Sequence, residues 1–252
     1  MNWPIVPGAE PFAHVAEHAG VGALVIHGFT GTPVSMLPIG RALAAAGHHV
    51  ELPRLPGHAT HIDDMVATVW GDWYAEVAHA YDHLCQRADR VVVVGQSMGA
   101  TLALTLAVDR PVIGVVAINP LTRDRGADAY EMIDELLADG HTVVPGGPSD
   151  IACGEAFDPS YTDTPLAALR SLLHDGAGEL TDRLASGTAP LRLFTSRQDH
   201  VVDPADSEFL AGAWGGTVEH TWLERSYHVA TLDYDGELVT AGTAEFVARL
   251  AA

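Results

Sequence analysis

A serine at position 97 stands between two glycines in the string Gly95-Gln96-Ser97-Met98-Gly99. The four valines before this string are typical of a buried strand, and residues 100–107 after it are typical of a helix. So sharp a turn from strand to helix strains the serine backbone, and small residues two positions away on each side relieve the crowding. The turn would project Ser97 Oγ above a sheet as a nucleophile. The alternative is a glycine-rich connection in which the serine is passive.

A nucleophilic serine also needs hydrogen-bond donors for the oxygen that becomes negative during attack. The string His27-Gly28-Phe29-Thr30-Gly31 follows a strong strand pattern, and this is where folds with such a serine turn provide the second donor. We therefore predict that the backbone N–H groups of Phe29 and Met98 form an oxyanion hole. A His-Gly pair after a strand also forms tight turns, and we expect His27 to be structural and to hold that turn.

The acid and the base should follow Ser97 in the order serine, acid, histidine. Asp199 comes after the strand pattern at residues 191–196, and His228 comes after the pattern at residues 218–223. We predict that His228 takes the proton of Ser97 during attack and returns it to the leaving group. Asp199 would hold the imidazole in the required tautomer and stabilise the imidazolium.

Four other residues compete for these two roles. Asp203 is an alternative acid, although it also precedes Pro204 and would cap the helix that begins there. Asp124 would be the acid if the triad used the earlier strand at residues 112–119. His200 and His220 are weaker candidates for the base, because His200 adjoins the acid in sequence and His220 lies within a strand pattern.

Short β-branched apolar runs alternate with longer helical patterns along most of the chain. The predicted strands are residues 23–27, 48–52, 90–95, 112–119, 191–196 and 218–223. The predicted helices are residues 36–46, 66–87, 98–108, 205–213 and 237–250. This alternation predicts an α/β fold with a mostly parallel sheet that helices cover on both faces. The candidate catalytic residues all follow strands, so they should meet at the carboxyl edge of that sheet.

One segment, residues 121–187, interrupts the alternation. It contains two predicted helices at residues 127–138 and 165–173, a Gly/Pro-rich stretch at 143–148, and no convincing strand. We predict that this segment is a small cap over the site, and that residues 1–120 and 188–252 form the core domain. The alternative is an ordinary pair of crossover helices.

Composition excludes several classes of function. The chain has 252 residues, and 33 acidic side chains against 13 basic ones give a formal charge of −20. So acidic a protein is a poor partner for nucleic acid or for an anionic membrane surface. All 13 basic residues are arginines, which excludes Schiff-base chemistry, a Ser-Lys dyad and a Walker-type phosphate loop. A hydrophobic fraction of 48% is ample for a sizeable core.

Neither cysteine pairing nor targeting features point to an oxidising compartment. Cys85 and Cys153 are well separated and form no C-x-x-C motif. The first residues lack a basic stretch followed by an apolar one, and no continuous run of apolar residues reaches the about 18 residues of a membrane helix. We therefore expect a cytoplasmic protein that does not insert into membranes.

The remaining histidines and tryptophans favour structural roles. His79 and His83 lie four positions apart on a predicted helix, but no carboxylate motif accompanies them, so we expect an exposed helix face and no metal or cofactor. His58 and His61 indicate a polar loop near the mouth of the site. Two tryptophans, at positions 70 and 73, fall on helix positions that face the core.

Six strings that occur in order along the chain resemble a known family. They are Pro11-Phe12, His27-Gly28-Phe29-Thr30-Gly31-Thr32-Pro33, Leu52-Pro53-Arg54-Leu55-x-Gly57-His58, Gly95-x-Ser97-Met98-Gly99, Asp199-His200-Val201-Val202 and the string SYHVATLDYD at residues 226–235. Together they are similar to the small bacterial carboxylesterases and thermostable monoacylglycerol lipases of Bacillus type. The family usually has a second glycine where this chain has Ala100. Outside residues 121–187 the resemblance covers nearly the whole chain.

The resemblance implies an α/β-hydrolase fold with a small helical cap. It also implies a catalytic triad of Ser97, Asp199 and His228, with Phe29 and Met98 at the oxyanion hole. The expected activity is hydrolysis of carboxylic esters with short or medium acyl chains through an acyl-enzyme, with monoacylglycerols as plausible substrates. Alternatives are hydrolysis of lactones, thioesters or carbon–carbon bonds with the same triad, or a non-catalytic protein that binds a hydrophobic ligand or another subunit.

Overall fold

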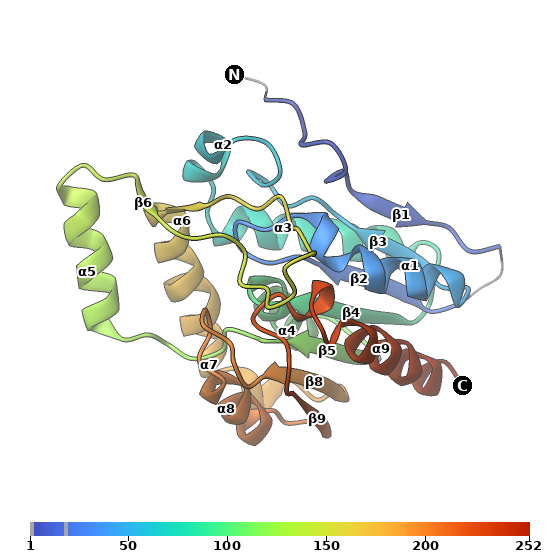
Figure 1. The fold of residues 1–252 in the computed structure, drawn as a ribbon. Coiled ribbons are helices and arrows are strands. Elements are labelled where there is room, and N and C mark those ends of the chain that lie inside the picture. Colours follow the sequence, from blue (N-terminus) through green and yellow to red (C-terminus); the bar gives the residue numbers. More distant parts are fainter. Residues whose placement is uncertain (1–2, 18–19) are drawn as a thin grey trace.

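A seven-stranded sheet runs through the computed structural model, which describes residues 3–17 and 20–252 (Figure 1). The spatial order of its strands is β1-β3-β2-β4-β5-β8-β9. The strands are β1 Phe12–His14, β2 Gly22–Ile26, β3 His49–Leu52, β4 Val91–Gln96, β5 Gly114–Ile118, β8 Leu191–Ser196 and β9 Val218–Leu223. β1 pairs antiparallel with β3, and the other neighbouring strands are parallel. The prediction of a mostly parallel sheet is confirmed.

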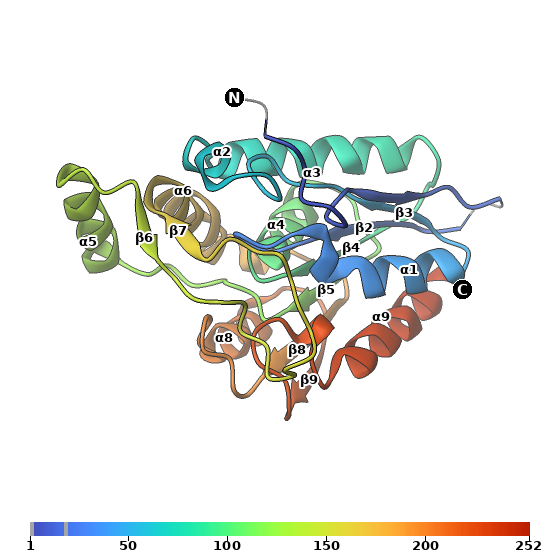
Figure 2. The ribbon, with the colours of Figure 1, turned by 45° about the horizontal axis from the view of Figure 1, so that its top comes forward.

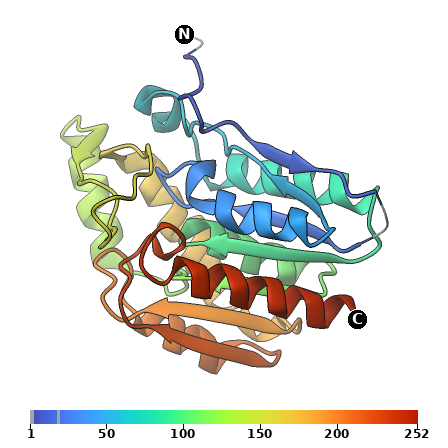
Figure 3. The same ribbon diagram turned by 45° about the vertical axis from the view of Figure 1, so that its right-hand side comes forward.

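Helices cover both faces of this sheet. One face packs against α1 (Leu37–Ala45) and α9 (Gly236–Ala251), and Figure 3 shows α9 running across it. The other face packs against α3 (Trp70–Cys85), α4 (Met98–Asp109) and α8 (Ala205–Ala213). Each face therefore has its own hydrophobic cluster, and the sheet separates the two.

The central strands are apolar because both of their faces are covered. Every residue of β2, β4 and β5 is buried, in keeping with the mostly apolar sequences of these strands. The longest helices, α3 and α9, have 16 residues each. In the described parts of the chain, no helix has both the length and the apolar character that crossing a membrane requires.

In the first third of the chain, the structure differs from the prediction at two elements. β1 was not predicted, because three residues of alternating exposure are too short to give a pattern. The predicted helix at 66–87 is two helices, α2 (Ile62–Val66) and α3. The hydroxyl and the N–H of Thr68 both donate to the Met65 carbonyl and end α2. Val69 is then extended and donates its N–H to Asp72, which starts α3.

The prediction of no strand within residues 121–187 is wrong. This segment contains α5 (Ala127–Ala138), β6 (Val143–Pro145), β7 (Asp163–Pro165) and α6 (Leu166–Ser171). β6 and β7 form a two-stranded antiparallel sheet in which Val144 opposes Thr164. Its three-residue strands pair across a long loop, so the sequence near each strand carries little signal. Figures 1 and 2 both show α5 apart from the seven-stranded sheet.

The last part of the segment 121–187 packs against the face of the seven-stranded sheet that α4 covers. A π-helical stretch (Leu172–Gly178), α7 (Glu179–Thr181) and a short turn (Leu184–Ser186) follow α6. Leu172, Leu180 and Leu184 are buried in the same hydrophobic cluster as α4. The division of the chain into core and cap at residues 121 and 187 stays a prediction. Other short helical turns are Pro33–Met36 and Ala230–Leu232.

Two histidines lie inside the core beneath the first strand-to-helix loop. His27 and His58 are fully buried and their rings meet edge to face at 5.0 Å between centroids. His27 Nε2 accepts the N–H of Leu55, so Nδ1 carries the proton and donates to the Gly28 carbonyl. This bears out the structural role predicted for His27. The prediction of a polar loop at His58 is wrong, because that ring also packs edge to face against Trp73.

Burial favours the neutral form of both rings. It lowers the pKa of His27 from 6.5 to about 4, and it lowers the pKa of His58 well below its ordinary value. A histidine with a depressed pKa binds protons more readily in the unfolded chain than in the folded one. Stability is therefore lost as the pH falls from about 6.5 towards 4.

We predict that replacing His27 with asparagine, whose amide still donates to a nearby carbonyl, weakens this acid dependence. The wild-type protein should lose about 1–2 kcal/mol of unfolding free energy through His27 between pH 7 and pH 5. The His27→Asn variant should lose less over the same interval, as measured by urea unfolding at both values. His141→Asn, at an exposed position, is the control and should keep the wild-type dependence. Equal losses in wild type and His27→Asn would contradict the prediction.

Candidate active site

The backbone at Ser97 adopts a strained conformation, with φ 56° and ψ −123°. Ser97 lies between the end of β4 and the start of α4, and its N–H donates to the carbonyl of Ile118 on β5. A Cβ on Gly95 would lie 2.0 Å from the Gly99 carbonyl oxygen, and one on Gly99 would lie 2.3 Å from the Ile26 carbonyl oxygen. Both glycines are therefore required for the turn to close.

Asp199 and His228 form a buried hydrogen-bonded pair. His228 Nδ1 lies 2.7 Å from Asp199 Oδ2, and the two side chains are 9% and 2% exposed. The other carboxylate oxygen of Asp199 accepts the N–H groups of Val201 and Val202, each at 2.8 Å. These three bonds fix the carboxylate, and the carboxylate orients the imidazole so that Nε2 is left for another partner.

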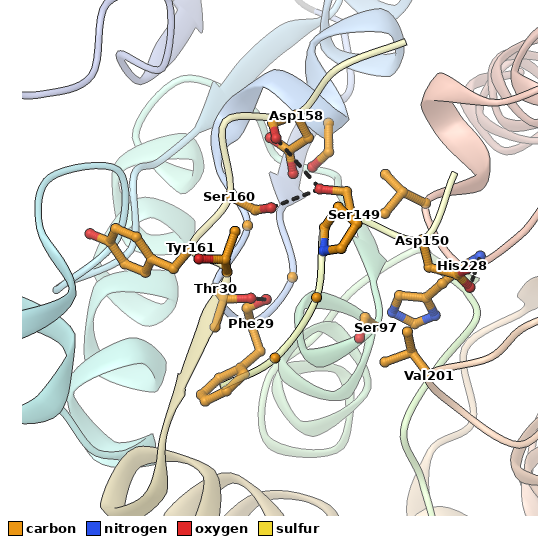
Figure 4. Close-up of a pocket in the computed structure, with 18 of the residues that line it drawn as sticks. Phe29, Thr30, Ser97, Ser149, Asp150, Asp158, Ser160, Tyr161, Val201 and His228 are labelled. Atoms are coloured by element: carbon orange, nitrogen blue, oxygen red, sulfur yellow. Dashed lines mark hydrogen bonds between the residues drawn. The ribbon is translucent and has the colours of Figure 1, made fainter. Parts of the chain in front are cut away.

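Ser97 and His228 line the same cavity, which has a volume of about 350 Å³. Figure 4 shows the His228 imidazole beside the Ser97 side chain. In the described part of the chain, no direct hydrogen bond joins Ser97 Oγ to His228. The structure thus brings Asp199 to His228 within bonding distance, and it brings His228 and Ser97 to one cavity wall.

The loop after β2 lies directly against Ser97. A Cβ on Gly28 would be 3.3 Å from the Ser97 Cβ. Phe29 follows in this loop and lines the cavity, while Met98 begins α4, which is a helix of 12 residues. Among the described residues, neither the Phe29 N–H nor the Met98 N–H donates to another backbone group. Both donors are therefore free for an oxygen beside Ser97, and the N-terminus of α4 adds a favourable field for negative charge.

The two alternative acids lie in other hydrogen bonds. Asp203 accepts the N–H of Ala205 and is 3.4 Å from Arg123, so it caps α8 as its sequence position suggested. Asp124 accepts the hydroxyl of Tyr130 and the N–H of Gly126 on the approach to α5. Neither carboxylate contacts His228.

The two alternative bases lie outside the cavity lining. His220 Nε2 lies 2.8 Å from the Thr195 hydroxyl within the sheet. His200 is 60% exposed, and its Nδ1 pairs with Asp150 at 2.9 Å. Neither imidazole lines the cavity that contains Ser97, whereas that of His228 does.

The other residues singled out in the sequence have structural contacts. His83 Nδ1 lies 2.8 Å from Glu51, whereas His61 begins α2 by accepting the N–H of Asp63. Trp70 and Trp73 are buried in the core, as predicted. In the part of the chain that the structure describes, no group of three metal-binding side chains converges.

The cavity has a polar end that sequence reasoning missed. Asp158, Ser149 and Ser160 lie on the loop between β6 and β7, and the two serine hydroxyls are 2.7 Å apart. Asp158 accepts the hydroxyl of Thr32 at 2.7 Å, which ties this loop to the loop after β2. Burial raises the pKa of Asp158 to about 6. Because this loop has no regular structure, no periodic signal placed these residues at the site.

The fold and this constellation define the class of α/β proteins that perform nucleophilic hydrolysis from a serine turn. Residues 23–241 match the family model described as "Alpha/beta hydrolase family", and the chain belongs to that family. The chain is 40% identical over 250 residues to a thermostable monoacylglycerol lipase of Bacillus sp. (strain H-257), with 98% of each chain covered. It is 24% identical over 230 residues to a carboxylesterase of Bacillus subtilis (strain 168), covering 90% and 92%.

Solved structures agree with this fold. One, from work on the metagenome-derived lipolytic enzymes LipS and LipT, has a TM-score of 0.90 at 34% identity and covers 98% of this chain and 100% of its own. A monoglyceride lipase of Saccharomyces cerevisiae has a TM-score of 0.76 at 12% identity and covers 100% and 95%. The predicted family and α/β-hydrolase fold are confirmed.

The close backbone contacts at Gly99, in the turn that carries Ser97, lead to a prediction about stability. Gly99→Ala would push a methyl group into the Ile26 and His27 carbonyl oxygens, at 2.3 and 2.5 Å. We expect this variant to lose at least about 3 kcal/mol of unfolding free energy, since a close backbone contact cannot relax as a side chain can. Gly212→Ala, on α8 with open space around it, is the matched control and should gain about 0.5–1 kcal/mol. Equal stability of the two variants in chemical denaturation would contradict the expectation.

Proposed function

We propose that this protein is a serine hydrolase of carboxylic esters that cleaves monoacylglycerols of short or medium acyl chain. The observation that carries the proposal is the 2.7 Å contact between Asp199 and His228, because His228 lines the cavity that contains the strained Ser97. The full-length similarity to a monoacylglycerol lipase supports it.

The chemistry begins with attack of Ser97 Oγ on the ester carbonyl carbon. His228 Nε2 takes the hydroxyl proton, and Asp199 stabilises the imidazolium that forms. The carbonyl oxygen becomes negative and accepts hydrogen bonds from the N–H groups of Phe29 and Met98. When the tetrahedral intermediate collapses, the bond to the alcohol oxygen breaks and His228 returns its proton to that oxygen.

An acyl group is then attached to Ser97 and the alcohol has left. A water molecule attacks the same carbonyl carbon, with His228 now taking a proton from the water. When the second tetrahedral intermediate collapses, the bond between the carbonyl carbon and Ser97 Oγ breaks and His228 returns its proton to Oγ. The carboxylic acid leaves and the Ser97 hydroxyl is regenerated. All proton transfers use one imidazole, and the reaction needs no cofactor.

The polar end of the cavity supports an alcohol part with free hydroxyl groups. Asp158, Ser149, Ser160 and Thr30 present oxygen atoms to the cavity. Figure 4 shows them around the same cavity as Ser97, where they offer hydrogen-bond partners to the free hydroxyl groups of an alcohol. Apolar cavity residues such as Phe29 suit an acyl chain. A glycerol monoester has both parts, whereas a simple alkyl ester lacks the hydroxyl groups.

The two unpaired cysteines support a reducing compartment. Cys85 and Cys153 are both free thiols, and Cys85 is exposed. Exposed free thiols are rare in oxidising compartments. We propose a cytoplasmic enzyme whose partner is a small-molecule ester.

Removal of the nucleophile tests the proposal most simply. Ser97→Ala should keep the wild-type circular dichroism and unfolding midpoint, and its turnover of p-nitrophenyl butyrate and of a medium-chain monoacylglycerol should fall at least about 10³-fold. Ser186→Ala, at a serine outside the cavity, is the control and should retain wild-type turnover. Undiminished turnover by purified Ser97→Ala protein would refute the proposed role of Ser97.

We expect the Asp158 carboxylate to lower the stability of the folded protein and to help bind the alcohol part of the substrate. Its raised pKa means that the folded state binds a proton more tightly than the unfolded chain does, so the ionised carboxylate costs stability as the pH rises through about 4 to 6. We expect Asp158→Asn to gain about 1–3 kcal/mol of unfolding free energy at pH 8. The same variant should lose about ten-fold in kcat/KM for a monoacylglycerol relative to the ethyl ester of the same acid.

Both measurements have a matched control. Asp128→Asn changes an exposed carboxylate on α5 and should alter neither quantity. A wild-type ratio of monoacylglycerol to ethyl ester turnover in Asp158→Asn would show that this carboxylate does not recognise the alcohol.

A further inference from the structure

A single carboxylate from the loop after β6 joins the two loops that carry Asp199 and His228. Asp150 Oδ2 accepts the N–H of His200, next to Asp199, and the N–H of His228 itself, each at 3.1 Å. The backbone carbonyl of Asp150 accepts the N–H of Val229 at 3.0 Å. The Asp150 side chain is only 17% exposed, and Figure 4 shows it beside His228.

A second carboxylate makes the reverse connection. Asp233, in the loop that follows His228, accepts the N–H groups of Ala152 at 2.8 Å and Cys153 at 2.9 Å. It also accepts the N–H of Tyr227 at 2.8 Å, directly before His228. Asp150 and Asp233 thus clamp residues 150–153 to residues 227–233 from both sides. We call these two residues and their bonds the carboxylate clamp.

Every polar group of His228 except Nε2 forms a hydrogen bond within the protein. Its Nδ1 is bonded to Asp199, its N–H to Asp150, and its carbonyl accepts the side-chain amide of Asn119 at 2.8 Å. Only Nε2 remains for Ser97 and the substrate. Asp150 is also the one of these partners that lies within the segment 121–187, outside the strand ends that carry the triad.

We propose that Asp150 is a positioning residue for the candidate base His228. The loop after β6 then helps to align the triad and also covers the cavity. The proposal rests on the proposed function. The negative carboxylate accepts two N–H groups that would otherwise lose protein partners, and charge-assisted bonds of this kind are the stronger ones. Displacement of His228 by a fraction of an ångström would misalign Nε2 with Ser97 Oγ.

Three variants separate positioning from charge. Asp150→Ala removes both bonds to the loops. Asp150→Asn keeps an oxygen that accepts the same two N–H groups but removes the charge. His200→Ala removes the imidazole, whose Nδ1 lies 2.9 Å from Asp150 Oδ1, and keeps the N–H at position 200 that Asp150 accepts.

The kinetic readout is steady-state hydrolysis of a short p-nitrophenyl ester, together with the rate of reaction with a fluorophosphonate. We expect Asp150→Ala to lower kcat and the fluorophosphonate rate about 10- to 100-fold, with KM nearly unchanged. Asp150→Asn should stay within about three-fold of wild type because its hydrogen bonds remain. His200→Ala should stay within about two-fold, since a contact made by a side chain as exposed as His200 contributes little.

Hydrogen exchange gives a readout that does not depend on catalysis. In Asp150→Ala, amide exchange in the peptide containing residues 227–233 should accelerate about ten-fold, while exchange in β4 and β5 should stay as in wild type. Wild-type exchange in that peptide, or a folded Asp150→Ala with kcat within about two-fold of wild type, would overturn the proposal. If the wild-type protein itself neither hydrolyses esters nor reacts with fluorophosphonate, the proposed function fails, and exchange still decides whether Asp150 holds the loop.

Discussion

The close contact between two chain turns at Ser97 is the constraint on which the rest of the site depends. The Ser97 backbone occupies a region that side chains rarely adopt, and it stays there because Gly95 and Gly99 allow neighbouring backbones to approach. That approach brings the loop after β2, which contains Phe29, to the start of α4, which begins at Met98. The parallel strands then bring the loops after β8 and β9 to the same edge.

Local sequence was enough for the parts of the fold that local rules control. The strands β8 and β9 and the helices α5 and α8 begin and end where their patterns predicted, because burial on one or two faces determines their periodicity. The serine turn and the two late loops could also be predicted, since each follows a strand. β6 and β7 could not, because three-residue strands pair across a distance that no window spans.

The polar contacts that complete the site were beyond sequence reasoning for a related reason. Asp150 and Asp158 lie in an irregular loop, and their partners are 50 or more positions away in the chain. The prediction for His58 was wrong because a histidine can be buried when its Nδ1 donates a hydrogen bond to a nearby carbonyl. In His58 that carbonyl is the one of Pro56. For the two aspartates, tertiary hydrogen bonds rather than periodicity decide where the side chains lie.

A crystal structure of the protein after reaction with a fluorophosphonate tests the central claim most directly. We expect one adduct, bonded through phosphorus to Ser97 Oγ, with a phosphonyl oxygen about 2.7–3.1 Å from both the Phe29 and the Met98 nitrogen. His228 Nε2 should lie within hydrogen-bond distance of Ser97 Oγ, with the Asp199 pair intact. An adduct on another residue, or an imidazole remote from the modified serine, would contradict the account.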